Sequence, residues 1–147
     1  MPGVKIEHRI GIRAPAATIW EILSDIEGWE AGNPLYPKAR GALRIGGRLE
    51  LEMALPGQPR RAIQPVILDW VPNDQIHWRL SLLGGLVRTV RYMEIEILSE
   101  TGCIFSNGEI FDGWLGPFAA RQVGAAARQG FIQLGESLKT LAEARAG

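Results

Sequence analysis

The chain has 147 residues, of which 46% are hydrophobic and 22% are charged, and its 16 basic side chains balance 16 acidic ones. These proportions are typical of a globular protein, and the length predicts one domain over residues 1–147. A net charge near zero gives no basic excess of the kind that nucleic-acid binders carry, and it argues against electrostatic recruitment to anionic membranes.

Cysteine and histidine are rare. With Cys103 alone, no disulfide can form within one chain, and with two histidines a metal site is improbable. No phosphate loop or dinucleotide fingerprint occurs. Residues 1–9 carry charges where a signal peptide needs an apolar stretch, and no long apolar run follows. We therefore expect a cytoplasmic protein without metal, cofactor or stable membrane insertion; its oligomeric state is open, and a homodimer is one option.

The first part of the chain predicts one strand and two short helices. Apolar and polar residues alternate over residues 4–12, which indicates a half-buried strand. Ala14-Pro15 ends the strand, and Pro15 suits the first turn of a helix over residues 16–23. Ser24-Asp25 then predicts the cap of a second short helix over residues 26–29.

The middle of the chain predicts a series of strands separated by turn residues. Pro65 falls inside one of them and indicates an edge or a bulge, because proline cannot donate to a ladder. The predicted strands cover residues 49–55, 62–71, 75–82, 86–98 and 103–111.

The last third predicts one long amphipathic helix over residues 117–144, since apolar residues there recur every three or four positions. Gly124, Gly130 and Gly135 would leave space beneath this helix, which a pocket could use. Strands segregated from helices indicate an α+β fold with an antiparallel sheet. We expect a curved sheet of about six or seven strands wrapped round the C-terminal helix.

Turn geometry predicts which side chains share the inner face of that sheet. A three-residue loop at 100–102, with Gly102 left-handed, pairs Met93 with Glu109 and makes Arg91 and Glu109 diagonal neighbours. A two-residue turn at Gly84-Gly85 places Trp78 opposite Arg91 and Leu80 opposite Thr89. The inward face is then expected to carry Met93, Ile95, Ile97, Phe105 and Phe111 together with Thr89, Arg91, Asn107 and Glu109.

Arg91 and Glu109 are the most informative of these residues, because charges are rarely buried without a partner. Two interpretations remain open. The two side chains form a buried ion pair, or they line a cavity in which arginine anchors an anionic group of a ligand and glutamate orients it. A register error of one residue would place both in solvent instead.

Several motifs resemble a known family. They are residues 12–20 (IRAPAATIW), Asn33-Pro34, residues 76–78 (IHW) and residues 107–115 (NGEIFDGWL). They are similar to the polyketide cyclase/dehydrase and lipid-transport family of the START and Bet v 1-like (SRPBCC) superfamily. The resemblance covers nearly the whole chain and implies the helix-grip fold, with Tyr36 in the loop-rich region near a pocket entrance.

Three functions follow as hypotheses. The first is binding or carriage of a hydrophobic small molecule such as a lipid, isoprenoid, aromatic or polyketide-like compound. The second is a cyclase or dehydratase with Glu109 as the candidate catalytic residue; loss of turnover in Glu109→Gln with ligand affinity retained would indicate it. The third, a co-chaperone-like interaction module, needs an exposed patch that the sequence does not locate. The expected ligand contacts are Tyr36, Trp78, Thr89, Arg91, Met93, Asn107, Glu109 and Phe111.

Overall fold

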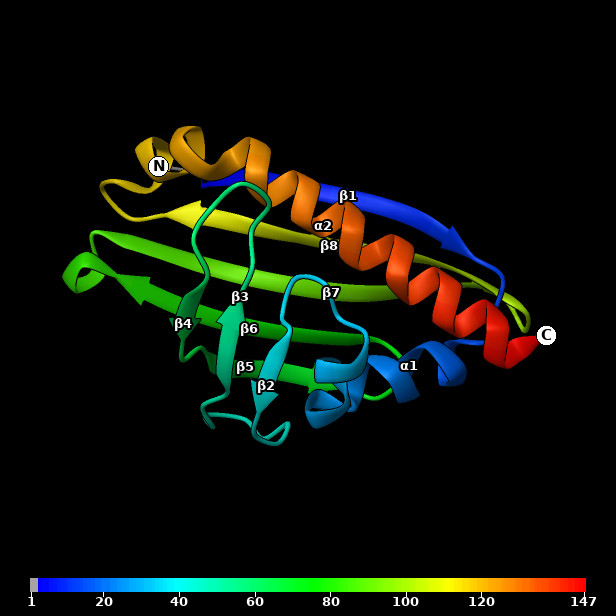
Figure 1. Ribbon diagram of the computed structural model, residues 1–147. Coiled ribbons are helices and arrows are strands. Elements are labelled where there is room, and N and C mark those ends of the chain that lie inside the picture. The colour runs from blue at the N-terminus through cyan, green and yellow to red at the C-terminus, as the bar shows by residue number, and fades with distance from the viewer. Residues whose placement is uncertain (1–2) are drawn as a thin grey trace.

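A five-stranded antiparallel sheet curves around the long C-terminal helix α2 in the computed structural model, which describes residues 3–147 (Figure 1). The strand order is β1-β8-β7-β6-β5, so the first and last strands of the chain are neighbours. The bounds are Val4–Ile12 for β1, Val66–Val71 for β5, Gln75–Leu82 for β6, Val87–Ser99 for β7, Gly102–Asp112 for β8 and Gly116–Ala146 for α2. The predicted α+β fold and antiparallel sheet are confirmed.

Two short helices connect β1 to the rest of the molecule. Helix α1 spans Ala16–Ser24, and the 3-10 helix η1 spans Ile26–Ala31, so both predicted helices are present. The Asp25 carboxylate accepts a hydrogen bond from the Gly28 amide at 3.2 Å, which caps η1 as the sequence indicated. Both helices lie beside the C-terminal end of α2 (Figure 1).

A second, three-stranded sheet replaces part of the single sheet that we expected. Its strands are β2 (Lys38–Arg40), β3 (Glu50–Met53) and β4 (Arg61–Ile63), in the order β2-β3-β4. The predicted strand over residues 62–71 is therefore wrong as one unit. It breaks at Pro65, which cannot donate to a ladder, and its halves belong to different sheets.

The glycines of α2 allow close packing and do not leave space. A Cβ atom at Gly130 would come within 2.9 Å of Leu35, and one at Gly135 within 3.3 Å of Ile10. The helix therefore approaches β1 and the loop before β2 more closely than a helix with larger side chains could. The expectation that these glycines make room for a pocket is wrong.

The pairing of β7 with β8 differs from the prediction by two residues. Arg91 lies directly opposite Glu109 and Met93 opposite Asn107, because residues 100–101 form a two-residue connection and the register shifts between Ile97 and Ser99. Gly102 is also not left-handed. A shift of two residues keeps every side chain on its predicted face, since the strand period is two. Ile97 is the exception: it is 61% exposed at the end of the hairpin.

The pairing of β6 with β7 confirms the prediction: Trp78 is opposite Arg91 and Leu80 is opposite Thr89. The connection itself is longer than a two-residue turn, because residues Leu83–Gly85 form a short 3-10 helix, η2. Leu83 adopts a left-handed backbone with φ of 53°, which is strained for a leucine. Within residues 3–147, no helix is long and apolar enough to cross a membrane.

Candidate functional site

A cavity of about 420 Å³ lies between the inner face of the large sheet, the small sheet and the N-terminal half of α2. Its wall is largely apolar and comes from segments far apart in the sequence. The apolar lining comprises Met53, Leu55, Ile63, Trp78, Leu80, Leu82, Leu83, Val87, Phe111, Leu115, Phe118, Ala119, Val123 and Ala127. This volume falls within the range of about 300–1,000 Å³ that is usual for small-molecule pockets.

Three polar side chains on this wall have unused hydrogen-bonding capacity. The Thr89 hydroxyl is buried without a hydrogen-bond partner among the described residues. The Glu109 carboxylate borders the cavity and is partly exposed; the Thr89 hydroxyl lies near it, and the remaining lone pairs of the carboxylate have no partner among the described residues. The Tyr36 hydroxyl accepts a hydrogen bond from Arg91 at 2.9 Å but donates to no described residue. Buried polar groups normally find partners, so these three can serve a ligand.

Tyr36 is held in place by the backbone and by aromatic packing. The Asn33 side-chain oxygen accepts hydrogen bonds from the amides of Leu35 and Tyr36 at 3.0 and 2.9 Å, which fixes the turn before β2. The Tyr36 ring lies 5.6 Å from the Trp29 ring and 5.4 Å from the Trp78 ring, measured between centroids. The phenol therefore reaches the cavity from a rigid aromatic cluster.

Arg91 lies behind the cavity wall and is 1% exposed. Its guanidinium donates to the Tyr36 hydroxyl, to the backbone oxygens of Tyr92 and Gly108, and to the Asn107 side-chain oxygen, at 2.9–3.0 Å. It also lies 4.3 Å from the centroid of the Phe131 ring on α2, a cation–π contact. Neutral acceptors thus satisfy this charge, and among the described residues no carboxylate comes within 4.0 Å of it.

The predicted ion pair between Arg91 and Glu109 is therefore absent from the described residues, although the two residues face each other across β7 and β8. Burial raises the pKa of the Glu109 carboxyl above its ordinary value, while the nearby Thr89 hydroxyl and the charge of Arg91 act in the opposite direction. Burial is also the largest cause that raises the pKa of Tyr36, and Arg91 opposes it. The site thus combines a phenol with a carboxyl group that is less acidic than usual.

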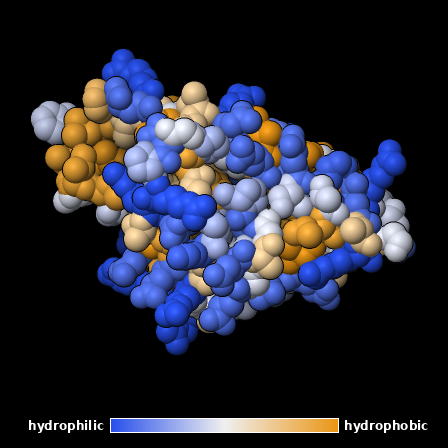
Figure 2. Space-filling view, in the orientation of Figure 1, coloured by the Kyte–Doolittle hydropathy of each residue, from blue (hydrophilic) through white to orange (hydrophobic). Residues whose placement is uncertain are grey.

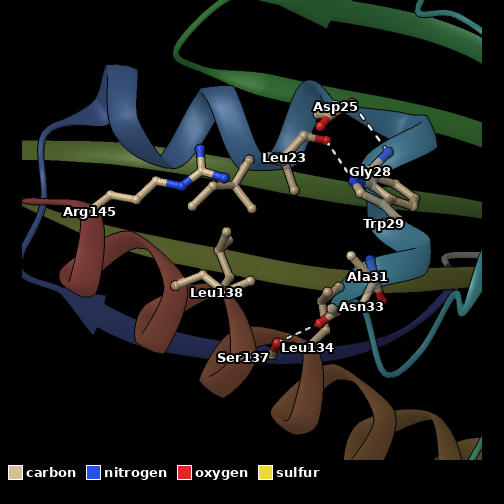
Figure 3. Close-up of a pocket in the computed structure, with 13 residues that line it drawn as sticks. Leu23, Asp25, Gly28, Trp29, Ala31, Asn33, Leu134, Ser137, Leu138 and Arg145 are labelled. Carbon is tan, nitrogen blue, oxygen red and sulfur yellow. Dashed lines mark hydrogen bonds between the residues drawn. The ribbon is translucent and has the colours of Figure 1, made fainter.

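A smaller cavity, of about 140 Å³, lies between α1, η1 and the C-terminal part of α2 (Figure 3). Two of its polar groups already have partners: Ser137 donates to the Gly32 oxygen at 2.7 Å, and the Trp29 indole donates to the Leu23 oxygen at 3.1 Å. Its volume is below the usual range for small-molecule pockets. The larger cavity is therefore the better candidate site.

The structure brings five of the eight expected ligand contacts to the cavity wall. Tyr36, Trp78, Thr89, Glu109 and Phe111 line it. Arg91, Met93 and Asn107 are fully buried and do not line it. Asn107 bonds Arg91 and donates to the Phe131 oxygen of α2 at 3.2 Å, so it joins the sheet to the helix.

Sequence reasoning missed the contributions of the small sheet and of α2. Among these are two polar side chains, Arg61 on β4 and Gln122 on α2. The signal for Gln122 was weak, because it lies beside the apolar stripe of an amphipathic helix and is exposed. No pattern placed Arg61 near a cavity, because its strand was not separated from β5 in the prediction.

Comparisons with solved structures support the fold. The Zhui aromatase/cyclase from Streptomyces sp. R1128 has a TM-score of 0.77 at 20% sequence identity, covering 97% of this chain and 94% of that chain. A norcoclaurine synthase point mutant from Thalictrum flavum has a TM-score of 0.74 at 14% identity, covering 100% and 99%. A START superfamily protein from Mycobacterium smegmatis has a TM-score of 0.73 at 18% identity, covering 96% and 98%.

No curated protein sequence matches this chain. The family model described as polyketide cyclase/dehydrase and lipid transport matches residues 3–143, which is nearly the whole chain. The motifs at residues 12–20 and 107–115 lie within this match. The protein belongs to the polyketide cyclase/dehydrase and lipid transport family.

Proposed function

We propose that the protein binds an apolar small molecule that carries at least one hydrogen-bonding group. The observation that supports this most strongly is the combination of an apolar cavity of about 420 Å³ with three polar side chains of unused capacity on its wall. Apolar burial would provide affinity, and a few polar contacts would fix the orientation of the ligand.

The polar groups indicate which ligand chemistry fits. Tyr36 can donate to a carbonyl or ether oxygen, because Arg91 already occupies the phenol oxygen as an acceptor. The ionised Glu109 carboxylate can only accept a hydrogen bond, so it suits a hydroxyl or phenol of the ligand. Thr89 can do either. A ligand with a carbonyl and a hydroxyl on an apolar skeleton would use all three groups.

Native mass spectrometry of the purified protein is the experiment that tests this proposal. We expect an added mass of a small molecule that disappears on denaturation, with chromatography of the released material giving its chemical class. Where purification removes the ligand, titration with a panel of apolar hydroxy-ketones, followed by tryptophan fluorescence, to which Trp78 on the cavity wall contributes, is expected to show saturable binding. A protein that shows no added mass and no saturable binding would contradict the proposal.

A second candidate function is a cyclase or dehydratase, and one observation favours it. Tyr36, which accepts a hydrogen bond from Arg91, can polarise a carbonyl, and Glu109, whose pKa is raised by burial, is a stronger base than an ordinary carboxylate. If Glu109 is the base, turnover rises with pH through its raised pKa, because only the ionised form accepts a proton.

Glu109→Gln then loses turnover while ligand affinity changes little, because the amide keeps the shape of the carboxylate but cannot take up the proton. Turnover with candidate substrates and affinity by titration are measured on the same preparations. A variant that loses affinity and turnover equally would indicate that Glu109 only binds the ligand.

A further inference from the structure

Four large apolar side chains are exposed at one end of the molecule. Leu83 is 68% exposed, Leu86 40%, Trp114 85% and Phe118 52%. They come from η2, the start of β7, the loop after β8 and the first turn of α2. Figure 2 shows the apolar patch at the left, where η2 and the start of α2 lie in Figure 1. We call Leu83, Leu86, Trp114 and Phe118 the apolar tip.

The fold holds the apolar tip together as one surface. The Leu115 amide donates to the Leu86 oxygen at 2.8 Å, which joins the loop after β8 to the start of β7. Gly113 permits this approach, because its φ is 86° and a Cβ atom there would lie 2.6 Å from the Leu86 oxygen. Trp114 is therefore presented to solvent beside Leu86, and no described residue covers it.

Two residues of the apolar tip border the candidate cavity. Leu83 and Phe118 are exposed and line the cavity at the same time. Gln122 and Arg61, two other lining residues, are exposed as well. The exposed border of the cavity is therefore partly apolar, at Leu83 and Phe118, and partly polar, at Arg61 and Gln122.

Unpaired positive charges lie beside the apolar tip. Arg61, Arg88 and Arg121 are exposed and form no ion pair with any residue in 3–147. The acidic residues near them are Asp112, across the ladder from Arg88, Glu109 on the cavity wall, and Glu7, which lines the same groove as Arg121. The net charge of zero therefore conceals unpaired arginines beside the apolar tip.

We propose that the apolar tip docks on the surface of an anionic membrane, from which the cavity takes up its ligand or to which it delivers it. Tryptophan and phenylalanine suit the membrane–water interface, and unpaired arginines beside them attract anionic headgroups. A second copy of the chain fits this surface less well, because a twofold contact would bring the same arginines against each other. Uptake or delivery of a ligand at the membrane rests on the proposed function, since that function supplies the apolar ligand.

Sedimentation with sucrose-loaded vesicles tests the docking. Vesicles of phosphatidylcholine with 30% phosphatidylglycerol are compared with vesicles of phosphatidylcholine alone. We expect the protein to bind the anionic vesicles, and we expect high salt to weaken that binding. Trp114→Ala/Leu86→Ala and Arg88→Glu/Arg121→Glu are each expected to reduce the partition coefficient at least tenfold. None of these four residues lines the cavity.

Matched controls carry the same changes elsewhere on the surface. Ile97→Ala/Leu98→Ala removes two apolar side chains that are 61% and 63% exposed at the opposite end of β7. Arg13→Glu/Arg44→Glu makes the same change in charge at two other exposed arginines. Both controls are expected to partition like the wild type. Equal losses in tip and control variants, or no vesicle binding by the wild type, would overturn the proposal.

Two further measurements separate this proposal from the proposed function. Binding of a soluble fluorescent apolar probe, 1-aminoanthracene, is measured without vesicles, and the tip variants are expected to bind it as the wild type does. Probe binding without vesicle binding overturns the docking alone, whereas vesicle binding without probe binding contradicts the proposed function alone. Light scattering that shows a dimer, lost in Trp114→Ala/Leu86→Ala and without vesicle binding, would assign the surface to a second copy and overturn the docking.

Discussion

Replacing Arg91 with methionine is expected to lower the free energy of unfolding by about 3–5 kcal/mol, because four buried acceptors lose their hydrogen-bond donor. The guanidinium is 1% exposed and gives four hydrogen bonds that join Tyr36, β7 and β8. Each buried acceptor that loses its donor costs about 1–3 kcal/mol, while removing the desolvated charge returns part of this. Since a domain is stable by about 5–15 kcal/mol, the loss is large.

Urea unfolding followed by tryptophan fluorescence measures this change. Arg88→Met is the matched control, because Arg88 lies on the same strand but is exposed and donates no hydrogen bond to a described residue. Its free energy of unfolding is expected to stay within about 0.5 kcal/mol of the wild type. Arg91→Lys retains the charge but lacks the planar fork of donors, so it is expected to lose much of the same stability. An Arg91→Met variant as stable as Arg88→Met would contradict the structural role assigned to this network.

The strands and their faces could be predicted because alternation carries that information directly. Burial of one face of β7 and β8 requires apolar residues at every second position, so an error of two residues in the register left the faces unchanged. The register itself depended on the turn at residues 100–102. Turn residues restrict the possible backbone shapes but do not select one of them, and the shift between Ile97 and Ser99 leaves no pattern in the sequence.

The candidate site could be predicted only in part, because its partners come from distant segments. The alternation placed Thr89, Glu109 and Phe111 on one inner face, and all three line the cavity. The fate of Arg91 was not predictable, since the acceptor that replaces the carboxylate is Tyr36, 55 residues away in the sequence. Opposite charges on one face of a sheet indicate that the two side chains lie close together. Whether the arginine then bonds the carboxylate or other acceptors depends on its rotamer, which packing fixes.

The exposure of the apolar tip could not be predicted from the sequence either. Trp114 lies just before α2 and Phe118 in its first turn, and the apolar periodicity that predicts the helix does not place either side chain. Their exposure depends on where the helix begins relative to the edge of the sheet. Leu83 precedes two glycines in a connection that looked like a simple turn, and its strained backbone directs it outward.

Filling the cavity from α2 is expected to abolish most ligand binding. Val123 lines the cavity from the N-terminal half of the helix, and Val123→Trp places an indole in the space that the ligand would occupy. If about 100 Å² of apolar ligand surface can no longer be buried, the loss is about 2.5 kcal/mol. This corresponds to an increase of roughly sixtyfold in Kd. Titration with the ligand identified by mass spectrometry, or with 1-aminoanthracene, measures it.

Gln129→Trp adds the same side chain to an exposed position of α2 that does not line the cavity, so its Kd is expected to stay close to that of the wild type. Circular dichroism checks that both variants fold, and Ala119→Leu provides a smaller filling of the same cavity should the indole not be accommodated. The order of affinities then shows whether the ligand occupies this cavity. Wild type and Gln129→Trp should bind tightly, Ala119→Leu less tightly and Val123→Trp least, because affinity follows the space left inside. Equal affinities in all four would place the ligand elsewhere, since an indole at position 123 would occupy part of this cavity.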